Sequence, residues 1–360
     1  MTTQIKYSIL LPLSALALVA CDEKDAPYVA PQEPSEVILT QALADSLWGE
    51  YASAYPYVEQ VVTAPTSITD PYYEDYVDNW LVDGEETRDV TITFDGDQAQ
   101  VTFDPDSKSK DQKFVKIEQQ GAHLIIRNDS VTVAGEAAGR ARMNYILRGA
   151  SSDGSVRIYS NKKFMVTLDG LSLTNAHGPA ISVQKSLDKK RMFLRLAEGS
   201  TNALCDAETY TDIVDGEDDK GCLFSEGKII LMGHGKLTIT GNYNHALAAD
   251  DRLHIQQGVQ LTVIGNSKDG IHVKDEVVQS GGLVRVFGRK DAVQCDTLAT
   301  GYLLRGGRLL TCGKRALTAS PFSYQGGSFC QIGQVVKAPD NAVANVDTIQ
   351  QKGYLLLESH

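Results

Sequence analysis

IILMGHGKLTITG (229–241) is the first of five stretches that share one pattern and decide the fold; the others are LHIQQGVQLTVIG (253–265), VVQSGGLVRVFG (277–288), LLRGGRLLTCG (303–313) and FSYQGGSFCQIG (322–333). Each stretch has apolar residues, one or two glycines, alternating apolar residues and a closing glycine. A short motif follows the first four: NHAL (244–247), KDGI (268–271), KDAV (290–293) and KRAL (314–317). Each unit holds strands of about 3–5 residues, which cannot bury an apolar face alone, so we expect successive units to stack around one core.

The spacing of the closing glycines, 20–25 residues, indicates the kind of repeat. Helical repeats need about 33–47 residues per unit. A coil of three short strands and three turns needs about 22–25 residues, and glycine is expected at its turns because it alone enters positive φ without penalty. The pattern therefore predicts a parallel β-helix. The alternative, an all-β sandwich of hairpins, would favour Asn-Gly or Asp-Gly turns, and the repeat region has only Asp269-Gly270.

Residues 1–21 have the pattern of a bacterial lipoprotein signal. Lys6 precedes an apolar run, and the segment closes with Leu18-Val-Ala-Cys21. Cleavage before Cys21 would leave that residue as the lipid-attachment site and anchor the protein without a membrane span. The alternative is an ordinary cleaved signal with a chance cysteine. We expect a cell-envelope protein at the outer membrane or cell surface, and the leaflet that holds the anchor stays open.

The segments before the repeats divide into a linker and a cap. Residues 22–36 are rich in proline and charge, as in a flexible linker. Residues 37–88 are expected to form an N-terminal cap, with one amphipathic helix within 37–62 and a cluster of aromatic and acidic residues at 71–80. The aromatic residues of that cluster are the alternative candidates for carbohydrate binding: Tyr72, Tyr73, Tyr76 and Trp80. Residues 89–360 are the expected β-helical domain.

Charge and cysteine content exclude some classes of partner. The net charge is −12, and the sequence has no evident basic patch, so nucleic acid is not expected as a partner. The export signal places the cysteines outside the reducing cytosol. Cys205 and Cys222 bracket an acidic loop, and a disulfide between them would restrict its unfolded freedom. Cys312 could pair with Cys330, which leaves Cys295 over, and a zinc site lacks support because no C-x-x-C motif occurs.

Aspartates recur in phase with the repeat. One repeat later in a stacked fold means about 4.8 Å further along the same face, so we expect Asp269 to stack on Asp291 and Asp251 on Asp275. Paired carboxylates repel each other unless a cation or protons neutralise them, and Ca²⁺ takes oxygen ligands. The pattern therefore predicts a calcium site; the alternative is a solvated turn. The candidate ligands are Asp250, Asp251, Asp269, Asp275, Asp291 and Asp296.

Signals for catalysis are few. The sequence contains no nucleophile elbow, no HExxH motif and no P-loop. Lys274, beside Asp275, is a weak candidate for a Brønsted base acting next to a metal-neutralised uronate.

Several segments resemble a known family: VTITFDGDQAQV (90–101), VTLDGLSLTN (166–175), LRLAEGSTNALCD (194–206), CLFSEGKIILMGHGKLTITGNYNHAL (222–247) and KDGIHVKD (268–275). They are similar to bacterial carbohydrate-binding proteins built as calcium-binding right-handed parallel β-helices, which bind cellulose and polygalacturonate and are related to pectate lyases. The resemblance implies a non-catalytic module with calcium at Asp-Gly-Ile steps. This chain keeps most of that step only at 269–275, because His245 and Arg315 occupy the equivalent positions of two other units.

The sequence thus predicts an all-β protein, a right-handed parallel β-helix solenoid with an N-terminal cap. The expected function is lipid-anchored, extracytoplasmic polysaccharide binding, non-catalytic and assisted by calcium, with acidic, pectin-like glycans as candidate ligands. The alternatives are a polysaccharide lyase acting on uronates and a structural adhesin without a sugar site. The oligomeric state stays open.

Overall fold

The computed structural model describes residues 38–76, 86–103, 115–128, 141–160, 162–184, 191–297, 301–341, 345–351 and 354–359. Two helical elements precede the strands: the α-helix α1 (Gln41–Ala54) and the 3-10 helix η1 (Tyr73–Asp75). The strands are β1 (Glu86–Asp95), β2 (Gln98–Phe103), β3 (Lys116–Gln120), β4 (His123–Asn128), β5 (Ala141–Ser151), β6 (Ser155–Ser160), β7 (Phe164–Thr174), β8 (Ile181–Gln184), β9 (Met192–Leu196), β10 (Thr201–Cys205), β11 (Gly221–Ser225), β12 (Ile229–Gly233), β13 (Lys236–Gly241), β14 (His245–Ala249), β15 (Leu253–Ile255), β16 (Gln260–Gly265), β17 (Ile271–Val273), β18 (Glu276–Cys295), β19 (Gly301–Thr318), β20 (Phe322–Tyr324), β21 (Ser328–Val335), β22 (Val346–Gln351) and β23 (Tyr354–Ser359).

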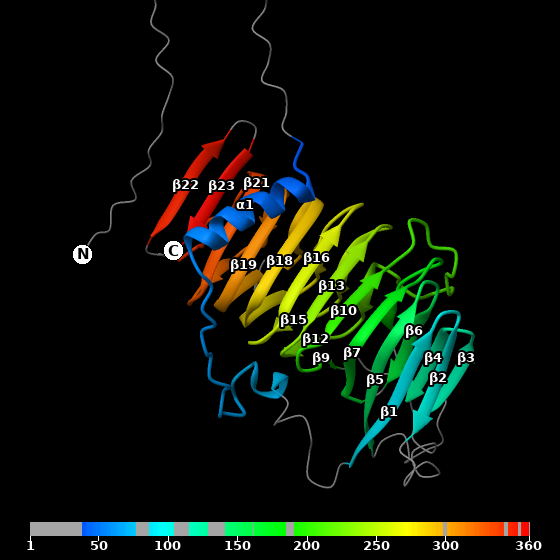
Figure 1. Ribbon diagram of the computed structural model, residues 1–360. Helices are drawn as coiled ribbons and strands as arrows, with labels where there is room; N and C mark the ends of the chain where they lie inside the picture. The colour runs from blue at the N-terminus through cyan, green and yellow to red at the C-terminus, as the bar shows by residue number, and fades with distance from the viewer. Residues whose placement is uncertain are drawn as a thin grey trace, which may run out of the picture.

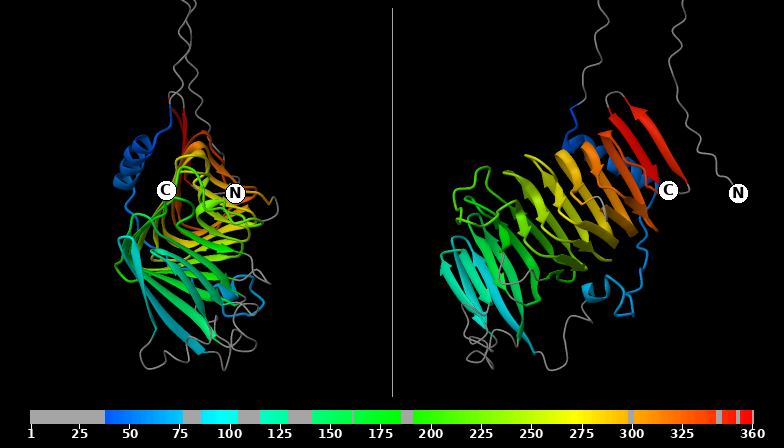
Figure 2. Two further views of the ribbon diagram at one scale, coloured as in Figure 1. Left: turned by 90° about the vertical axis from the view of Figure 1, so that its right-hand side faces the viewer. Right: turned by 180° about the vertical axis from the view of Figure 1, so that it is seen from behind.

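Each strand from β7 to β15 pairs in parallel with the strand three places further along the chain. β10 pairs with β13, β13 with β16, β11 with β14 and β12 with β15. Figure 1 shows these strands side by side along one axis, and Figure 2 shows the same stack from behind. We call this arrangement the parallel ladder. Antiparallel hairpins lie at both ends of it, β1–β2 and β3–β4 at one and β22–β23 at the other.

The repeat that the sequence predicts is confirmed in its register. The closing glycines occupy one row of the ladder, because Gly265 pairs with Gly241 and Gly288, and Gly313 pairs with Gly288 and Gly333. The alternating residues between them point their apolar side chains into one continuous core, which the strands build from residues such as Leu237, Leu261, Val284 and Leu309. The hydrophobic alternation therefore fixes which face of each strand is buried.

The predicted fold class is wrong in its architecture. In the described part of the chain, the strands are assigned to a closed parallel β-barrel of eight strands with further strands outside it, and not to an open right-handed parallel β-helix solenoid. The difference arises at the corners: the sequence predicts strands of about 3–5 residues separated by turns, but β18 and β19 run for 20 and 18 residues. All described strands consequently belong to one 23-stranded sheet, and only the all-β class is confirmed.

The helix of the expected N-terminal cap lies against the last strands of the ladder. Helix α1 begins at an N-cap, Thr40, whose side chain accepts a hydrogen bond from the Leu43 amide. Its buried residues, Ala44, Trp48 and Tyr51, recur at helical spacing and pack on the last strands rather than on the first. Tyr51 Oη donates a hydrogen bond of 2.6 Å to the Ser359 carbonyl, and Figure 1 shows α1 beside β19, β21 and β23.

The glycines of the repeat have two distinct roles. Inner glycines such as Gly282 and Gly307 adopt positive φ, 78° and 82°, as predicted for turns. None of the five closing glycines, all within the described residues, has positive φ. They are required for space: a Cβ on Gly288 would lie 1.8 Å from the Asp291 carbonyl oxygen, and one on Gly265 would lie 2.4 Å from that of Asp269.

The predicted disulfide between Cys205 and Cys222 is wrong. All five cysteines in the described part of the chain are free, and the Cys222 thiol is buried. The acidic loop between the two cysteines is held by charge instead. Arg157 on β6 pairs with Glu217 and, at 3.1 Å, with Asp219. Because this attachment already orders the loop, no covalent link is needed to hold it against the ladder.

Candidate functional site

A row of basic residues follows the closing glycines at one corner of the ladder. The backbone of Lys290 donates a hydrogen bond of 3.0 Å to the carbonyl of Lys268, which stacks these two residues. The register of the next strand places Lys314 beside Arg289 and Lys290. All four of these side chains are exposed, and neighbouring strands are about 4.8 Å apart. We call Lys268, Arg289, Lys290 and Lys314 the basic corner.

The basic corner corrects the view that the chain lacks a basic patch. Lys268, Lys290 and Lys314 each open one of the short motifs KDGI, KDAV and KRAL. They are 22 and 24 residues apart in sequence, so no basic run is visible, and they meet only when the strands stack. The common position of lysine in the three motifs was the signal that could have found them.

An aromatic and amide surface continues the corner toward the acidic loop. Tyr243 stacks on Tyr210 with ring centroids 4.2 Å apart and planes inclined at 25°, and 40% of Tyr243 stays exposed. Beside it, the Asn266 side chain donates a hydrogen bond of 2.8 Å to Oδ1 of Asn242. The Lys268 amide donates to the carbonyl of Asn244, so this surface and the lysine row share one corner. Exposed aromatic rings and amides are groups that contact sugar rings and hydroxyls.

A buried carboxylate supports this surface from below. Asp206 is 3% exposed and accepts hydrogen bonds from Tyr210 Oη at 2.6 Å and from the Asn242 amide at 2.6 Å. Burial raises its pKa to about 6, although these two hydrogen bonds oppose the rise. Asp206 therefore holds both Tyr210 and the turn at Asn242 in place. Because its pKa is raised, ionisation of this buried carboxyl lowers the free energy of unfolding, and the loss depends on pH.

We expect Asp206→Asn to increase stability at pH 7.5. The folded-state pKa, about 6, lies above the usual aspartate value near 3.9, so the folded state binds the proton more tightly and stability falls as pH rises from about 4 to about 6. An amide avoids that loss and should raise the free energy of unfolding by up to about 3 kcal/mol at pH 7.5. Thermal unfolding from pH 3.5 to 7.5 measures this, with exposed Asp169→Asn as the control; a less stable Asn variant at pH 7.5 contradicts it.

The structure brings Asp269 and Asp291 together as predicted, but their charges are already compensated. The Asp291 amide donates a hydrogen bond of 3.1 Å to Asp269 Oδ1. The Arg315 guanidinium binds both carboxylate oxygens of Asp291, at 2.6 and 2.7 Å. Asp269 Oδ2 lies 3.1 Å from Nδ1 of His245 and 3.2 Å from Nδ1 of His272. Both aspartates are fully buried, and the groups around them are an arginine, two imidazoles and a backbone amide rather than further carboxylates.

The pKa values in this group follow from burial and close charges. Burial lowers the pKa of His245, and the Asp269 contact offsets only part of that effect. Burial also acts to lower the pKa of His272, but the carboxylates of Asp269 and Asp296 outweigh it and raise that pKa. For Asp269, burial acts to raise the pKa, and the two histidines outweigh it and lower the pKa.

The remaining predicted aspartates share one row of the ladder with lysines. The register that pairs Ala249 with Val273 places Asp251 next to Asp275, as expected. Asp296 aligns with Lys274, because its amide donates to the Val273 carbonyl. Asp250 binds Lys220 Nζ at 2.8 Å and lies 4.0 Å from Lys274 Nζ. Acidic and basic residues therefore alternate along this row.

The tyrosines predicted as a sugar platform pack on the middle of the ladder. Tyr72 and Tyr76 make edge contacts with the ring of His254, and Arg252 lies 4.8 Å above the ring of Tyr72. Between them, buried Asp75 pairs with Arg191, Arg252 and His254 at 3.1–3.2 Å. Tyr72, Tyr73 and Tyr76 are partly buried. Trp80 lies outside the described residues, as does Cys21.

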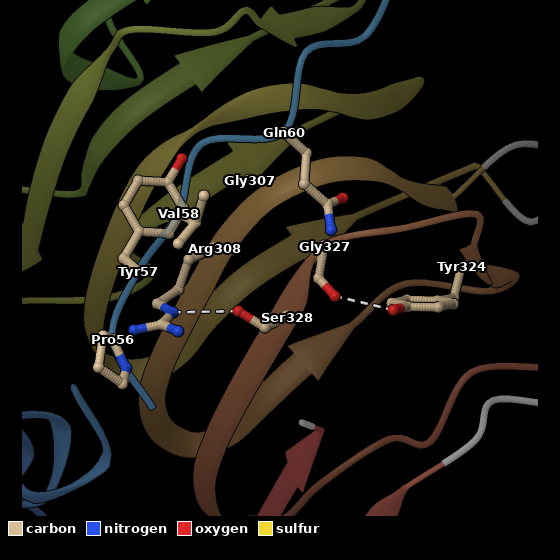
Figure 3. Close-up of a pocket in the computed structure, with 9 residues that line it drawn as sticks. All are labelled: Pro56, Tyr57, Val58, Gln60, Gly307, Arg308, Tyr324, Gly327 and Ser328. Carbon is tan, nitrogen blue, oxygen red and sulfur yellow. Dashed lines mark hydrogen bonds between the residues drawn. The ribbon is translucent and has the colours of Figure 1, made fainter. Parts of the chain in front are cut away.

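A separate pocket lies where the segment after α1 crosses the last strands. It measures about 280 Å³ and is lined by Pro56, Tyr57, Val58, Gln60, Gly307, Arg308, Tyr324, Gly327 and Ser328. Figure 3 shows Arg308 donating to Ser328, and Tyr324 donating to the Gly327 carbonyl. Glu59 fastens the same segment by accepting a hydrogen bond of 2.8 Å from the Gly282 amide. The pocket is thus a by-product of this attachment and contains none of the predicted site residues.

Comparison with known proteins places the chain in a family of carbohydrate-binding domain-containing proteins. The family of carbohydrate-binding domain-containing proteins matches residues 127–354, more than half of the chain, so the chain belongs to this family. A carbohydrate-binding domain-containing protein of Acetivibrio thermocellus is 33% identical over 118 residues, which are 32% of this chain and 40% of that protein. The match thus spans two fifths of the relative's length.

A solved structure gives a weaker likeness. It is that of the polysaccharide lyase-like protein from C. thermocellum, a gadolinium derivative. Its TM-score is 0.49 and its identity 19%, with 69% of this chain and 95% of that chain covered. Separately, none of the helices in the described ranges is long and apolar enough to cross a membrane.

Proposed function

We propose that this protein binds acidic polysaccharide at the basic corner without catalysing its cleavage. The observation that carries the proposal is the stack of Lys268, Lys290 and Lys314 on neighbouring strands. Like charges opposite each other on adjacent strands destabilise a sheet. Lys268 and Lys314 form no ion pair with any of the described residues, and the chain as a whole is acidic. A bound polyanion, such as a uronate chain lying across the strands, would relieve this repulsion at successive lysines.

The surface around Tyr243 supports a sugar ligand rather than a simple anion. A partly exposed aromatic ring next to the amides of Asn242 and Asn266 offers a stacking face and hydrogen-bond partners for hydroxyl groups. Membership of a carbohydrate-binding family agrees with this assignment. An adhesin without a sugar site would not need this combination of groups.

The geometry gives less support to the alternative function, a polysaccharide lyase acting on uronates. The base predicted for it, Lys274, is half-exposed and lies in a row of alternating charges beside Asp250 and Asp296. The three aligned lysines of the basic corner lie at the other end of these short strands, so Lys274 is not part of the proposed binding surface.

Calcium assistance stays part of the proposal at one position only. Calcium prefers oxygen ligands, so the two imidazoles at Asp269 do not suit it. Carboxylate oxygens of Asp218, Glu226 and Asp250 lie within 4.8 Å of one another. Lys220 Nζ lies among them, 2.9 Å from Asp218 and 2.8 Å from Asp250, and calcium would have to displace it.

The test is retention of the full chain on immobilised polysaccharides. We expect binding to polygalacturonate, weaker binding to neutral cellulose, and a decline in binding as salt is raised, because exposed charges are screened. EDTA should reduce binding only to the extent that calcium takes part. The measurement with EDTA therefore separates calcium assistance from binding of the polysaccharide by the basic corner. Equal retention on charged and neutral glycans contradicts recognition of acidic polysaccharide, and absence of retention on all of them leaves the adhesin reading.

We also propose that the protein is lipid-anchored at the cell envelope through Cys21. The support is the lipobox-like end of residues 1–21, which lie outside the described residues. Membrane fractionation of a Cys21→Ala variant tests this, and a correctly processed variant that stays with the membranes would refute it.

A further inference from the structure

We propose that His245, Asp269 and His272 form a binding site for a divalent transition metal of the zinc class, distinct from calcium and from the glycan surface. In the described part of the chain, two groups of at least three potential ligands have donor atoms within 4.8 Å of one another. The group of His245, Asp269 and His272 contains two imidazoles, whereas the other group has carboxylates only. Two histidines and one carboxylate are a donor set typical of zinc and related metals. The inference does not depend on the proposed glycan binding.

The donor atoms converge on one point. Nδ1 of His245 and Nδ1 of His272 lie 3.1 and 3.2 Å from the same atom, Oδ2 of Asp269. Zinc ligands at about 2.0–2.2 Å in a tetrahedron are separated from each other by roughly 3.4 Å. These distances therefore need to change by only a few tenths of an ångström to accept the ion. The rings of His245 and His272 lie side by side, with centroids 4.1 Å apart.

One donor atom is buried and lacks a hydrogen bond. The side chain of His245 is nine-tenths buried, and its Nδ1 has no hydrogen-bond partner despite its short distance to Asp269. A buried polar atom without a partner carries a desolvation penalty. Coordination of a metal ion by this nitrogen would remove that penalty, which distinguishes this group from a chance cluster of charged side chains.

The surrounding groups match the outer shell of a metal site. His272 Nε2, the nitrogen that faces away from Asp269, lies 3.2 Å from Oδ2 of Asp296. Metal-binding histidines almost always pair their second nitrogen with a carboxylate or a carbonyl in this way. The second oxygen of Asp269 accepts the Asp291 amide, which leaves Oδ2 for the metal. His272 and Asp269 are thereby held in place by neighbouring residues of the ladder.

The test is calorimetric titration of the untagged full chain with Zn²⁺ at pH 7.5, with Ca²⁺ in a parallel titration. We expect one equivalent of zinc to bind, and a hundredfold excess of Ca²⁺ not to displace it. His245→Ala and His272→Ala should abolish this binding, and Asp296→Asn should weaken it by about 10–100-fold. His234→Ala is the matched control, because His234 is exposed and lies near Glu198 on another corner.

Replacement of Zn²⁺ by Co²⁺ gives a second readout, a visible absorption band for a tetrahedral site. If His245→Ala does not fold, the partly exposed His272→Gln decides the matter. Absence of zinc binding by the folded wild-type chain, or undiminished binding by the folded His272 variants, overturns the proposal. Zinc binding that is lost equally in His234→Ala also overturns it.

Discussion

Replacing Lys268, Lys290 and Lys314 together by glutamate should reduce affinity for polygalacturonate by at least about 100-fold. Each charge-assisted hydrogen bond to a carboxylate contributes about 1.5–3 kcal/mol, and every 1.4 kcal/mol is a tenfold change in affinity. The reversed charges would also repel the polyanion. Affinity electrophoresis through gels with and without polygalacturonate measures the change, and single variants should each show a smaller loss.

The matched control is Lys236→Glu. Lys236 is exposed like the three lysines of the basic corner, but it starts β13, whereas those lysines follow the closing glycines Gly265, Gly288 and Gly313 of later repeats. We expect its affinity to match that of the wild type. Replacing the same three lysines by glutamine should keep the wild-type melting temperature or raise it, because three like charges are then removed from adjacent strands. Unchanged affinity in a folded triple variant would exclude the basic corner as the binding surface.

Gly288→Ala should lower the free energy of unfolding by at least about 3 kcal/mol, at the upper end for overpacked sites. The added Cβ would lie 1.8 Å from the Asp291 carbonyl oxygen, and backbone atoms cannot move aside as a flexible side chain does. The displaced strand also carries the contact between Asp269 and the Asp291 amide. Thermal and urea unfolding measure the loss.

Gly49→Ala is the control, because we expect it to change the free energy of unfolding in the opposite direction. Gly49 lies within α1, is exposed, and has no atom within 4 Å of the position that a Cβ would take. Alanine in a helix interior is more stable than glycine by about 0.5–1 kcal/mol. We therefore expect this variant to be slightly more stable than the wild type. Similar effects of both substitutions would show that the closing glycine is not required for space.

The features that the sequence predicts best are those with a short-range physical cause. Alternation of apolar residues fixes the buried face of each strand, and the repeat fixes the register, so the row from Gly241 to Gly333 and the stacking of Asp269 on Asp291 follow directly. Helix α1 follows from the amphipathic spacing of Trp48 and its neighbours. These properties need no knowledge of distant parts of the chain.

The features that the sequence misses depend on contacts between distant segments. Nothing in residues 41–54 indicates that they pack on β19 and β21 rather than on the first strands. The long continuous strands β18 and β19 replace expected turns, because corner residues such as Asp291 and Arg315 stay within the strands and pair across the ladder. The closing glycines look like turn residues, and only their neighbours reveal the lack of space.

The candidate site shows the same division. The aspartates were visible in sequence. Two of their partners, Arg315 and His245, lie one repeat away from the aspartates that they contact, so these contacts were not visible. The lysines of the basic corner were visible only as separate motifs. The predicted disulfide failed because proximity of Cys205 and Cys222 in sequence says nothing about which face of a strand each thiol occupies.

The hydrogen bond between Tyr51 and Ser359 joins residues 308 positions apart. Contacts of such large sequence separation carry the greatest loop-closure entropy and slow folding most. During synthesis, the strands between them can stack in chain order, while α1 must wait for β21 and β23 before its apolar face is covered. The same arrangement determines how a pulling force enters the molecule. Tension applied ahead of residue 38 passes through α1 into the C-terminal strands, so the last part of the chain to be made is the first to bear load.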